Sequence, residues 1–290
     1  MPRLNDEDIQ TREVLDWRGL HLLHFAGSAC SQKIRIVLNL KGITDWVSHP
    51  VNLAAQQNFT PWFLGINPRG LVPVLVHDGV VTIESNDILS YLDEIFPEPE
   101  LIASEHREEA LHLLREEDDL HLSLRSLTMR FVVPKLLAQK KPVSLSTYEQ
   151  DRGTVGGAAD PHKEVELRFW RDYARQGVTD EDVVAATTRF KDVYERFESL
   201  LEAQPYLAGE RLGALDIAWF IYTHRLGSAG YPFAREHPAV HRWYCALLGR
   251  PEFSREVAEP LPFRAIRAGL HAIQALCGTT LARVAAGAWK

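Results

Sequence analysis

The chain has 290 residues, of which 46% are hydrophobic and 24% charged, and its formal net charge is −7. The length allows two domains, and the composition is that of an ordinary globular protein. The acidic balance argues against a general nucleic-acid binder.

Cysteine usage bounds the redox chemistry. Cys30, Cys245 and Cys277 form an odd, scattered set with no Cys-x-x-Cys pair and no Cys/His spacing typical of a metal site. We therefore expect reduced thiols, no metal and a cytoplasmic location.

The first element in chain order is an acidic stretch, residues 1–19, which has no long apolar run. It is unlike a signal peptide and predicts a mobile N-terminal arm.

Residues 20–98 alternate between strand and helix patterns. We expect a strand at Leu20–Phe25, a helix at Cys30–Leu40 and a strand at Trp46–Val51. The runs Val72–Val76 and Val80–Ile83 flank an Asp-Gly pair, which is the strongest short hairpin signal, and a helix follows from Ser85. This order predicts an α/β domain with a small mixed sheet.

Helical patterns alone follow, and they predict an all-helical domain at 105–290. We expect long helices at about 105–130 and 180–203, and another that begins near Gly213. Residues 139–163 are polar and rich in glycine, and predict an extended loop or partial disorder.

The C-terminal tail, residues 263–290, is amphipathic and basic. Its least charged stretch is about 15 residues, short of the ~20 that span a bilayer. A helix of this kind can lie on a membrane surface, but we expect it to pack on its own domain.

The most informative segment is the turn that begins at Ser28, between the first strand and the first helix. A helix N-terminus presents unpaired N–H groups and a positive dipole end, which suit an anion such as a thiolate. Ser31 is a rival for the same role. Cys30 is either a small buried side chain or a second thiol that forms a mixed disulfide.

Two further elements point to the same ligand. Val72-Pro73 stands at the head of a strand, where a cis bond would leave the N–H and C=O of Val72 free to pair with an extended peptide. Glu84-Ser85 at a helix start would hold an ammonium and a carboxylate. A thiol site, a peptide-pairing strand and a zwitterion clamp describe glutathione.

These motifs resemble the N-terminal domain of cytosolic glutathione transferases, and most closely the serine-type zeta and theta classes and their bacterial relatives. The resemblance covers residues 20–97 strongly and continues weakly through Tyr206–Gly209 and Leu215–Ala218. It implies a thioredoxin-like α/β domain followed by an all-α helical bundle, and a homodimer.

The resemblance also implies roles for residues. Ser28 would donate a hydrogen bond to the glutathione sulfur, and the thiolate would attack a small hydrophobic electrophile in a detoxifying transfer. The basic group for the glycine carboxylate is not obvious, and Arg69 or Gln57 could serve.

Two departures and two alternatives remain. Ala29 stands where the zeta pattern has a second serine, which weakens a carry-over of isomerase activity, and Gly213 stands where the helix-capping motif has Ser or Thr. The Ser-x-Cys-Ser pattern also resembles glutathione-dependent reductive dehalogenases, and an ether-cleaving lyase would share the first step. The polar insert and amphipathic tail resemble ganglioside-induced differentiation-associated proteins, which suggests a non-catalytic binding or regulatory protein.

Overall fold

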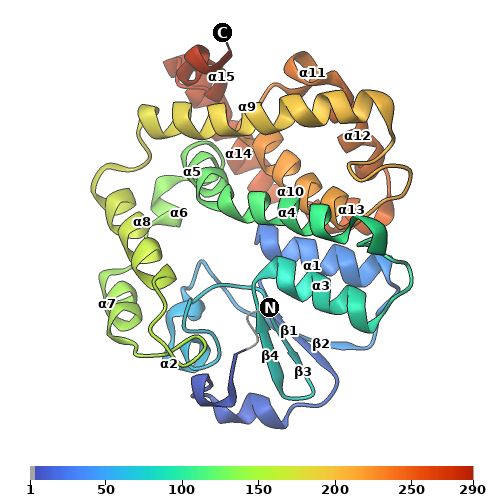
Figure 1. Cartoon of the computed structure of the whole chain (residues 1–290). Coiled ribbons are helices and arrows are strands. Elements are labelled where there is room, and N and C mark those ends of the chain that lie inside the picture. The colour runs from blue at the N-terminus through green and yellow to red at the C-terminus, as the bar shows by residue number, and fades with distance from the viewer. Residues whose placement is uncertain (1–3, 290) are drawn as a thin grey trace. The chain divides into compact units, whose positions relative to one another are not determined.

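The computed structural model describes residues 4–289, apart from the side chain of His106. The chain divides into two compact units (Figure 1). The first comprises the chain up to Pro99 together with Gln139–Arg175, and the second comprises Glu100–Ala138 and the chain from Gln176 onward.

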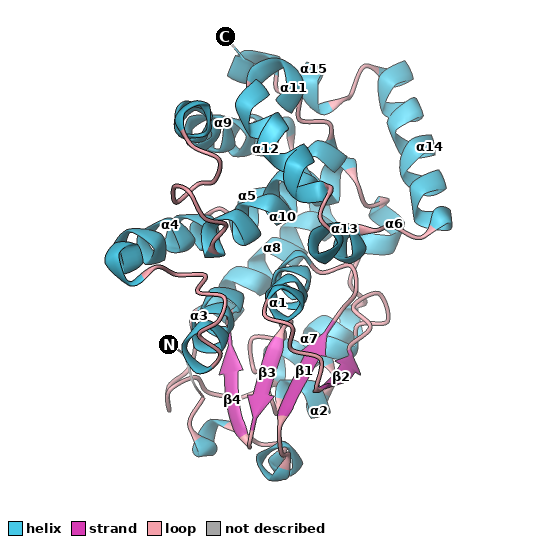
Figure 2. Ribbon diagram, turned by 90° about the vertical axis from the view of Figure 1, so that its right-hand side faces the viewer, coloured by secondary structure: helices cyan, strands magenta, loops and turns pink. Residues whose placement is uncertain are grey.

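The first unit is built on a four-stranded mixed sheet of order β2-β1-β3-β4 (Figure 2). Its strands are β1 (Leu20–His24), β2 (Trp46–Pro50), β3 (Val74–His77) and β4 (Val80–Ile83). β1 pairs in parallel with β2 and antiparallel with β3, which pairs antiparallel with β4. The mixed sheet expected from the sequence is thereby confirmed.

The turn between β3 and β4 follows its sequence signal. Asp78 and Gly79 both have positive φ, 48° and 82°, as a two-residue type I′ turn requires.

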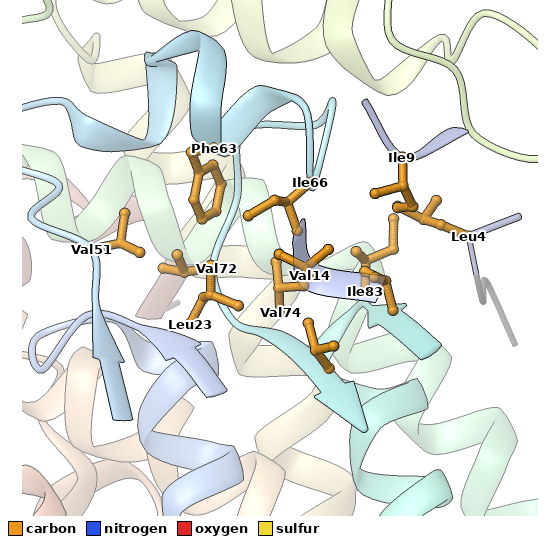
Figure 3. Close-up of a cluster of buried hydrophobic side chains, with 12 residues drawn as sticks. Leu4, Ile9, Val14, Leu23, Val51, Phe63, Ile66, Val72, Val74 and Ile83 are labelled. Atoms are coloured by element: carbon orange, nitrogen blue, oxygen red, sulfur yellow. The ribbon is translucent and has the colours of Figure 1, made fainter. Parts of the chain in front are cut away.

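Helices cover both faces of this sheet. The helices of the unit are α1 (Ala29–Leu40), α2 (Pro61–Leu64), α3 (Ser85–Ile95), α7 (Pro142–Gln150) and α8 (His162–Gln176). α1 and α3 pack against each other. On the other face, alternating side chains of β1, β3 and β4 meet α2 and the N-terminal segment in one apolar cluster (Figure 3).

The N-terminal segment is not a mobile arm, and that expectation was wrong for the described residues from Leu4 onward. Leu4, Ile9 and Val14 are buried in the cluster of Figure 3. The N–H of Leu4 donates to the carbonyl of Val81 at 3.0 Å, so the segment pairs with β4. Each buried aliphatic side chain contributes about 1.5–3 kcal/mol, enough to order a segment whose apolar residues follow neither a helical nor a strand period.

The polar segment 139–163 was expected to be an extended loop or partly disordered within the helical domain. Instead it contains α7 and belongs to the first unit. Its few apolar residues explain the difference. Tyr148 is fully buried and stacks on Phe59 with ring centroids 4.8 Å apart, while Leu167 of α8 joins the same small cluster.

The second unit is all-helical, as expected. Its helices are α4 (Arg107–Asp119), α5 (His121–Phe131), α6 (Lys135–Ala138), α9 (Asp180–Ala203), α10 (Ala214–Ala229), α11 (Phe233–Glu236), α12 (Pro238–Leu248), α13 (Pro251–Val257), α14 (Leu261–Cys277) and α15 (Leu281–Val284). The helix expected at 105–130 is two helices, α4 and α5, that meet at Leu120. α10 is buried on nearly all sides and forms the centre of the unit.

The first part of the C-terminal tail, α14, packs less than expected, whereas Leu281 and Ala285 further along are buried. Within α14 only Gln274 is buried, while Phe263, Ile273 and Leu276 are exposed. Polar groups make its contacts, since His271 lies 3.2 Å from the carbonyl of Phe131 and Arg267 pairs with Glu259 at 2.8 Å. No helix within residues 4–289 has the length and apolar character needed to cross a membrane.

Candidate active site

The register of the sheet brings the predicted site segments of the first unit to one edge. Leu23 of β1 pairs with Val74 of β3, and Val74 pairs with Ile83 of β4. The turn before Ser28, the Val72 segment and Glu84 all lie just beyond this row. Two strand spacings of about 4.8 Å separate the outer positions, which is about the length of an extended tripeptide.

Ser28 caps α1 at the end of this row. Its backbone is extended (φ −78°, ψ 126°), and its Oγ accepts a hydrogen bond from the N–H of Ser31 at 3.3 Å. The side chain is half-buried, and no acceptor among residues 4–289 takes its hydroxyl proton. The hydroxyl can therefore donate to a ligand without losing the cap.

The two neighbours of Ser28 differ in access. Ser31 is fully buried, and its Oγ lies 3.4 Å from the N–H of Phe25, so it stabilises the turn and is poorly placed to reach a ligand. Cys30 is half-exposed in the first turn of α1 and forms no disulfide.

A buried arginine stabilises the turn before Ser28 by hydrogen bonds to its backbone. Arg35 of α1 donates to the carbonyl of Ala26 at 3.0 Å and to Nδ1 of His24 at 3.1 Å. His24 Nε2 lies 2.8 Å from the hydroxyl of Ser48. His24 therefore fits as a neutral imidazole that accepts from Arg35 and donates to Ser48.

Burial, and then the charges of Arg35 and His49, lower the pKa of His24 to about 4. A histidine with a depressed pKa stabilises the fold fully above its unfolded pKa of about 6.5, and this contribution is lost as the pH falls towards 4. We expect the free energy of unfolding to drop by up to about 3 kcal/mol over that range. Urea denaturation across the range measures it. In His24→Gln, which cannot take up a proton, the free energy of unfolding should fall less steeply as the pH is lowered. An equally steep fall in this variant would exclude His24 as the source of the pH dependence.

Val72 lies next along the row, two residues before the start of β3. The Val72–Pro73 peptide bond is cis, as expected from the sequence. The side chain of Val72 is buried in the apolar cluster. Its N–H and C=O make no hydrogen bond with the described residues, so both can pair with an extended peptide.

Glu84 and Ser85 complete the row. Glu84 has φ 69° and ψ 124°, a conformation that costs a non-glycine residue free energy. Its carbonyl accepts the first helical bond of α3 from the N–H of Ile88 at 2.9 Å. The N-terminal N–H groups of α3 and the Ser85 hydroxyl thus lie beside a carboxylate, an arrangement that would suit a zwitterion.

The guanidinium of Arg69 is engaged by two carboxylates of its own unit. Its Nη1 lies 2.7 Å from Oε1 of Glu84, and its Nε donates to Asp160. Burial alone would lower the pKa of Arg69, but these two carboxylates outweigh burial and raise it. Burial and the Glu84 charge raise the pKa of Asp87 in the same group.

Gln57 is not joined to the other predicted residues by any hydrogen bond within the described chain. Its side-chain carbonyl accepts from the N–H of Asn52 at 2.7 Å and closes its own loop. Sequence reasoning missed Asp160, which is 91 positions from Arg69. No local pattern relates the two residues, so no sequence signal marks the contact.

The fold and this edge define a class of protein: a thioredoxin-like domain with a place for an extended thiol peptide, and a helical domain. Two family models match the chain, "Glutathione S-transferase, N-terminal domain" at residues 27–95 and "Glutathione S-transferase, C-terminal domain" at residues 165–244. The chain belongs to the cytosolic glutathione S-transferase superfamily.

Curated relatives match about a third of the chain. A zeta class glutathione S-transferase from Euphorbia esula is 43% identical over 93 residues, and a maleylacetoacetate isomerase from Pseudomonas aeruginosa is 39% identical over 89 residues. These matches cover 32% and 30% of the chain, and 41% and 42% of the relatives. The chain thus matches less than half of the length of these relatives.

Solved structures match over most of the chain. Beta-etherase LigF from Sphingobium is 26% identical with a TM-score of 0.67, over 82% of this chain and 98% of that one. A glutathione transferase from Phanerochaete chrysosporium, solved in complex with oxidized glutathione, is 18% identical with a TM-score of 0.58, over 87% and 98% of the two chains. The second likeness shows the fold alone.

Proposed function

We propose that this chain binds glutathione along the edge described above and transfers it to a small hydrophobic electrophile. The observation that carries the proposal is the row formed by Ser28, Val72 and Glu84-Ser85 just beyond the ends of three adjacent strands. Each member supplies what one part of the tripeptide needs: a hydroxyl donor for sulfur, free backbone groups for the peptide, and a carboxylate with a helix N-terminus for the zwitterion.

Ser28 activates the thiol in this proposal. A hydrogen bond from its hydroxyl and the dipole of α1 both favour the thiolate over the thiol. Lowering the thiol pKa by two units takes about 2.7 kcal/mol, and a charge-assisted hydrogen bond supplies about 1.5–3 kcal/mol. The thiolate then attacks the electrophilic carbon, and the leaving group departs with its electron pair.

Glutathione-dependent ether cleavage is the second candidate function. The likeness to a beta-etherase over most of the chain supports it. The first step is the same attack by the thiolate, on the carbon that bears the aryl ether oxygen, and an aryloxide leaves. A reductive dehalogenation would additionally need the Cys30 thiol to attack the glutathione sulfur of the conjugate.

Binding and turnover test the proposal in two stages. We expect retention on immobilised glutathione, elution by the free tripeptide, and conjugation of a dinitro-halobenzene. Phenol release from a β-aryl ether in the presence of glutathione would identify the second function. Retention without turnover of either substrate class would favour a binding protein, and no retention would reject the proposal.

A further inference from the structure

The segment 139–163, called the insert below, reaches the candidate site from a distant part of the sequence. The hydroxyl of Tyr148 donates to the carbonyl of Arg69 at 2.9 Å. Nearby, the carboxylate of Asp8 accepts from the N–H groups of Gly156 and Gly157, both at 2.9 Å. The insert is therefore held both by the backbone of Arg69 at the candidate site and by Asp8 of the N-terminal segment.

Asp160, near the end of the insert, controls the position of Arg69. One carboxylate oxygen accepts from Nε of Arg69, and the other accepts from the N–H of His162 at 3.0 Å at the start of α8. The Asp160 side chain is only 9% exposed, and that of Arg69 18%. A buried pair with one partner held by a helix start has a fixed geometry.

Arg69 passes this constraint to Glu84. Because Nε of Arg69 is engaged by Asp160, Nη1 contacts Oε1 of Glu84 at 2.7 Å. Glu84 is 28% exposed and so can still reach a ligand. The group contains one guanidinium and the carboxyls of Glu84, Asp87 and Asp160, so its charge favours a ligand that carries an ammonium group.

We propose that Asp160 is a positioning residue for the ammonium of the thiol substrate, acting through Arg69 and Glu84. This inference rests on the proposed function. Without the Asp160 charge, Arg69 turns its full charge on Glu84 and competes with the incoming ammonium. The insert thereby makes the site selective for a γ-glutamyl thiol with an unmodified amino group.

Asp160→Asn tests this most directly, since the single amide oxygen of asparagine can still accept from the N–H of His162, while the charge and the acceptor that face Arg69 are lost. We expect the KM for glutathione to rise about fivefold to twentyfold, as loss of one charge-assisted contact implies. The KM for the electrophile and kcat should stay within about twofold. The preference for glutathione over N-acetylglutathione should fall, which a general loosening of the fold would not cause.

Asp151→Asn is the matched control. Asp151 lies in the same insert and pairs with Lys163 at 2.7 Å, but it does not contact Arg69. It should leave the KM for glutathione unchanged. Asp160→Asn should add nothing in an Arg69→Gln background, because both changes break the same chain of contacts.

The outcomes separate the two proposals. If the wild-type protein does not bind glutathione in calorimetry, the proposed function fails. If it binds, and Asp160→Asn folds with an unchanged KM for glutathione and unchanged N-acetyl discrimination, the role of Asp160 is wrong. Should Asp160→Asn not fold, Asp160→Ser removes the same charge and keeps a capping hydroxyl, and the same criteria apply.

Discussion

Replacing Ser28 by alanine should lower kcat/KM for conjugation by about 10- to 1000-fold, or about 1.4–4 kcal/mol of transition-state stabilisation. The reason is the loss of the accessible hydroxyl at the N-terminus of α1, since the Ser28 side chain is half-buried whereas that of Ser31 is fully buried. Steady-state kinetics with varied glutathione and a fixed electrophile measures the change. Ser28→Thr, which keeps a hydroxyl, should retain more activity than Ser28→Ala.

A loss of stability must be separated from a loss of chemistry, because Ser28 also caps α1. Removing such a cap costs about 0.5–2 kcal/mol. Thr179→Ala removes a comparable cap at α9, where Thr179 accepts from the N–H of Asp182 at 3.2 Å. It should lower thermal stability similarly and leave turnover intact. Full turnover in Ser28→Ala would transfer the role to Cys30 or to a backbone N–H.

The second large effect concerns stability. Asp216 is fully buried in the first turn of α10 and accepts three hydrogen bonds, from the N–H of Gly213 (2.9 Å), the N–H of Leu207 (3.0 Å) and Nε1 of Trp243 (2.8 Å). Asp216→Ala leaves three buried donors without a partner, at about 1–3 kcal/mol each. We expect a loss of about 3–5 kcal/mol in the free energy of unfolding.

Chemical denaturation followed by circular dichroism measures this loss. Asp182→Ala is the matched control, since Asp182 occupies the same capping position on α9 but is exposed. It should cost about 1 kcal/mol. A loss of that small size in Asp216→Ala as well would mean that water or a rearranged backbone satisfies the three donors.

The sheet and the row of candidate site residues could be predicted from the sequence because their signals are local. The Asp78-Gly79 pair between β-rich runs requires a two-residue turn, and the hairpin in turn sets the register that joins Val74 to Ile83. Pro73 before one strand, and Ser28 and Ser85 after two others, indicated the backbone positions at which a ligand could bind. Each of these inferences used residues within a few positions of one another.

The rest depends on contacts between distant positions. Arg69 or Gln57 was expected to meet a ligand carboxylate. Arg69 pairs with Glu84 and with Asp160, and no nearby pattern identifies either contact. The insert was expected to be a loop because its polar composition hides one buried aromatic residue, Tyr148. The glycine at the capping position of α10 is also explained by a contact between distant positions. A Cβ on Gly213 would lie 2.8 Å from the carbonyl of Leu101, so serine or threonine does not fit there.

The most direct test of the central claim is the pKa of the glutathione thiol when it is bound to this chain. Thiolate absorbance in the ultraviolet, followed as a function of pH with the wild-type protein and with Ser28→Ala, measures it. We expect a pKa about two units below that of free glutathione in the wild type, and a value close to the free one in the variant. A bound thiol that titrates like free glutathione in the wild-type protein would contradict activation at the Ser28 turn.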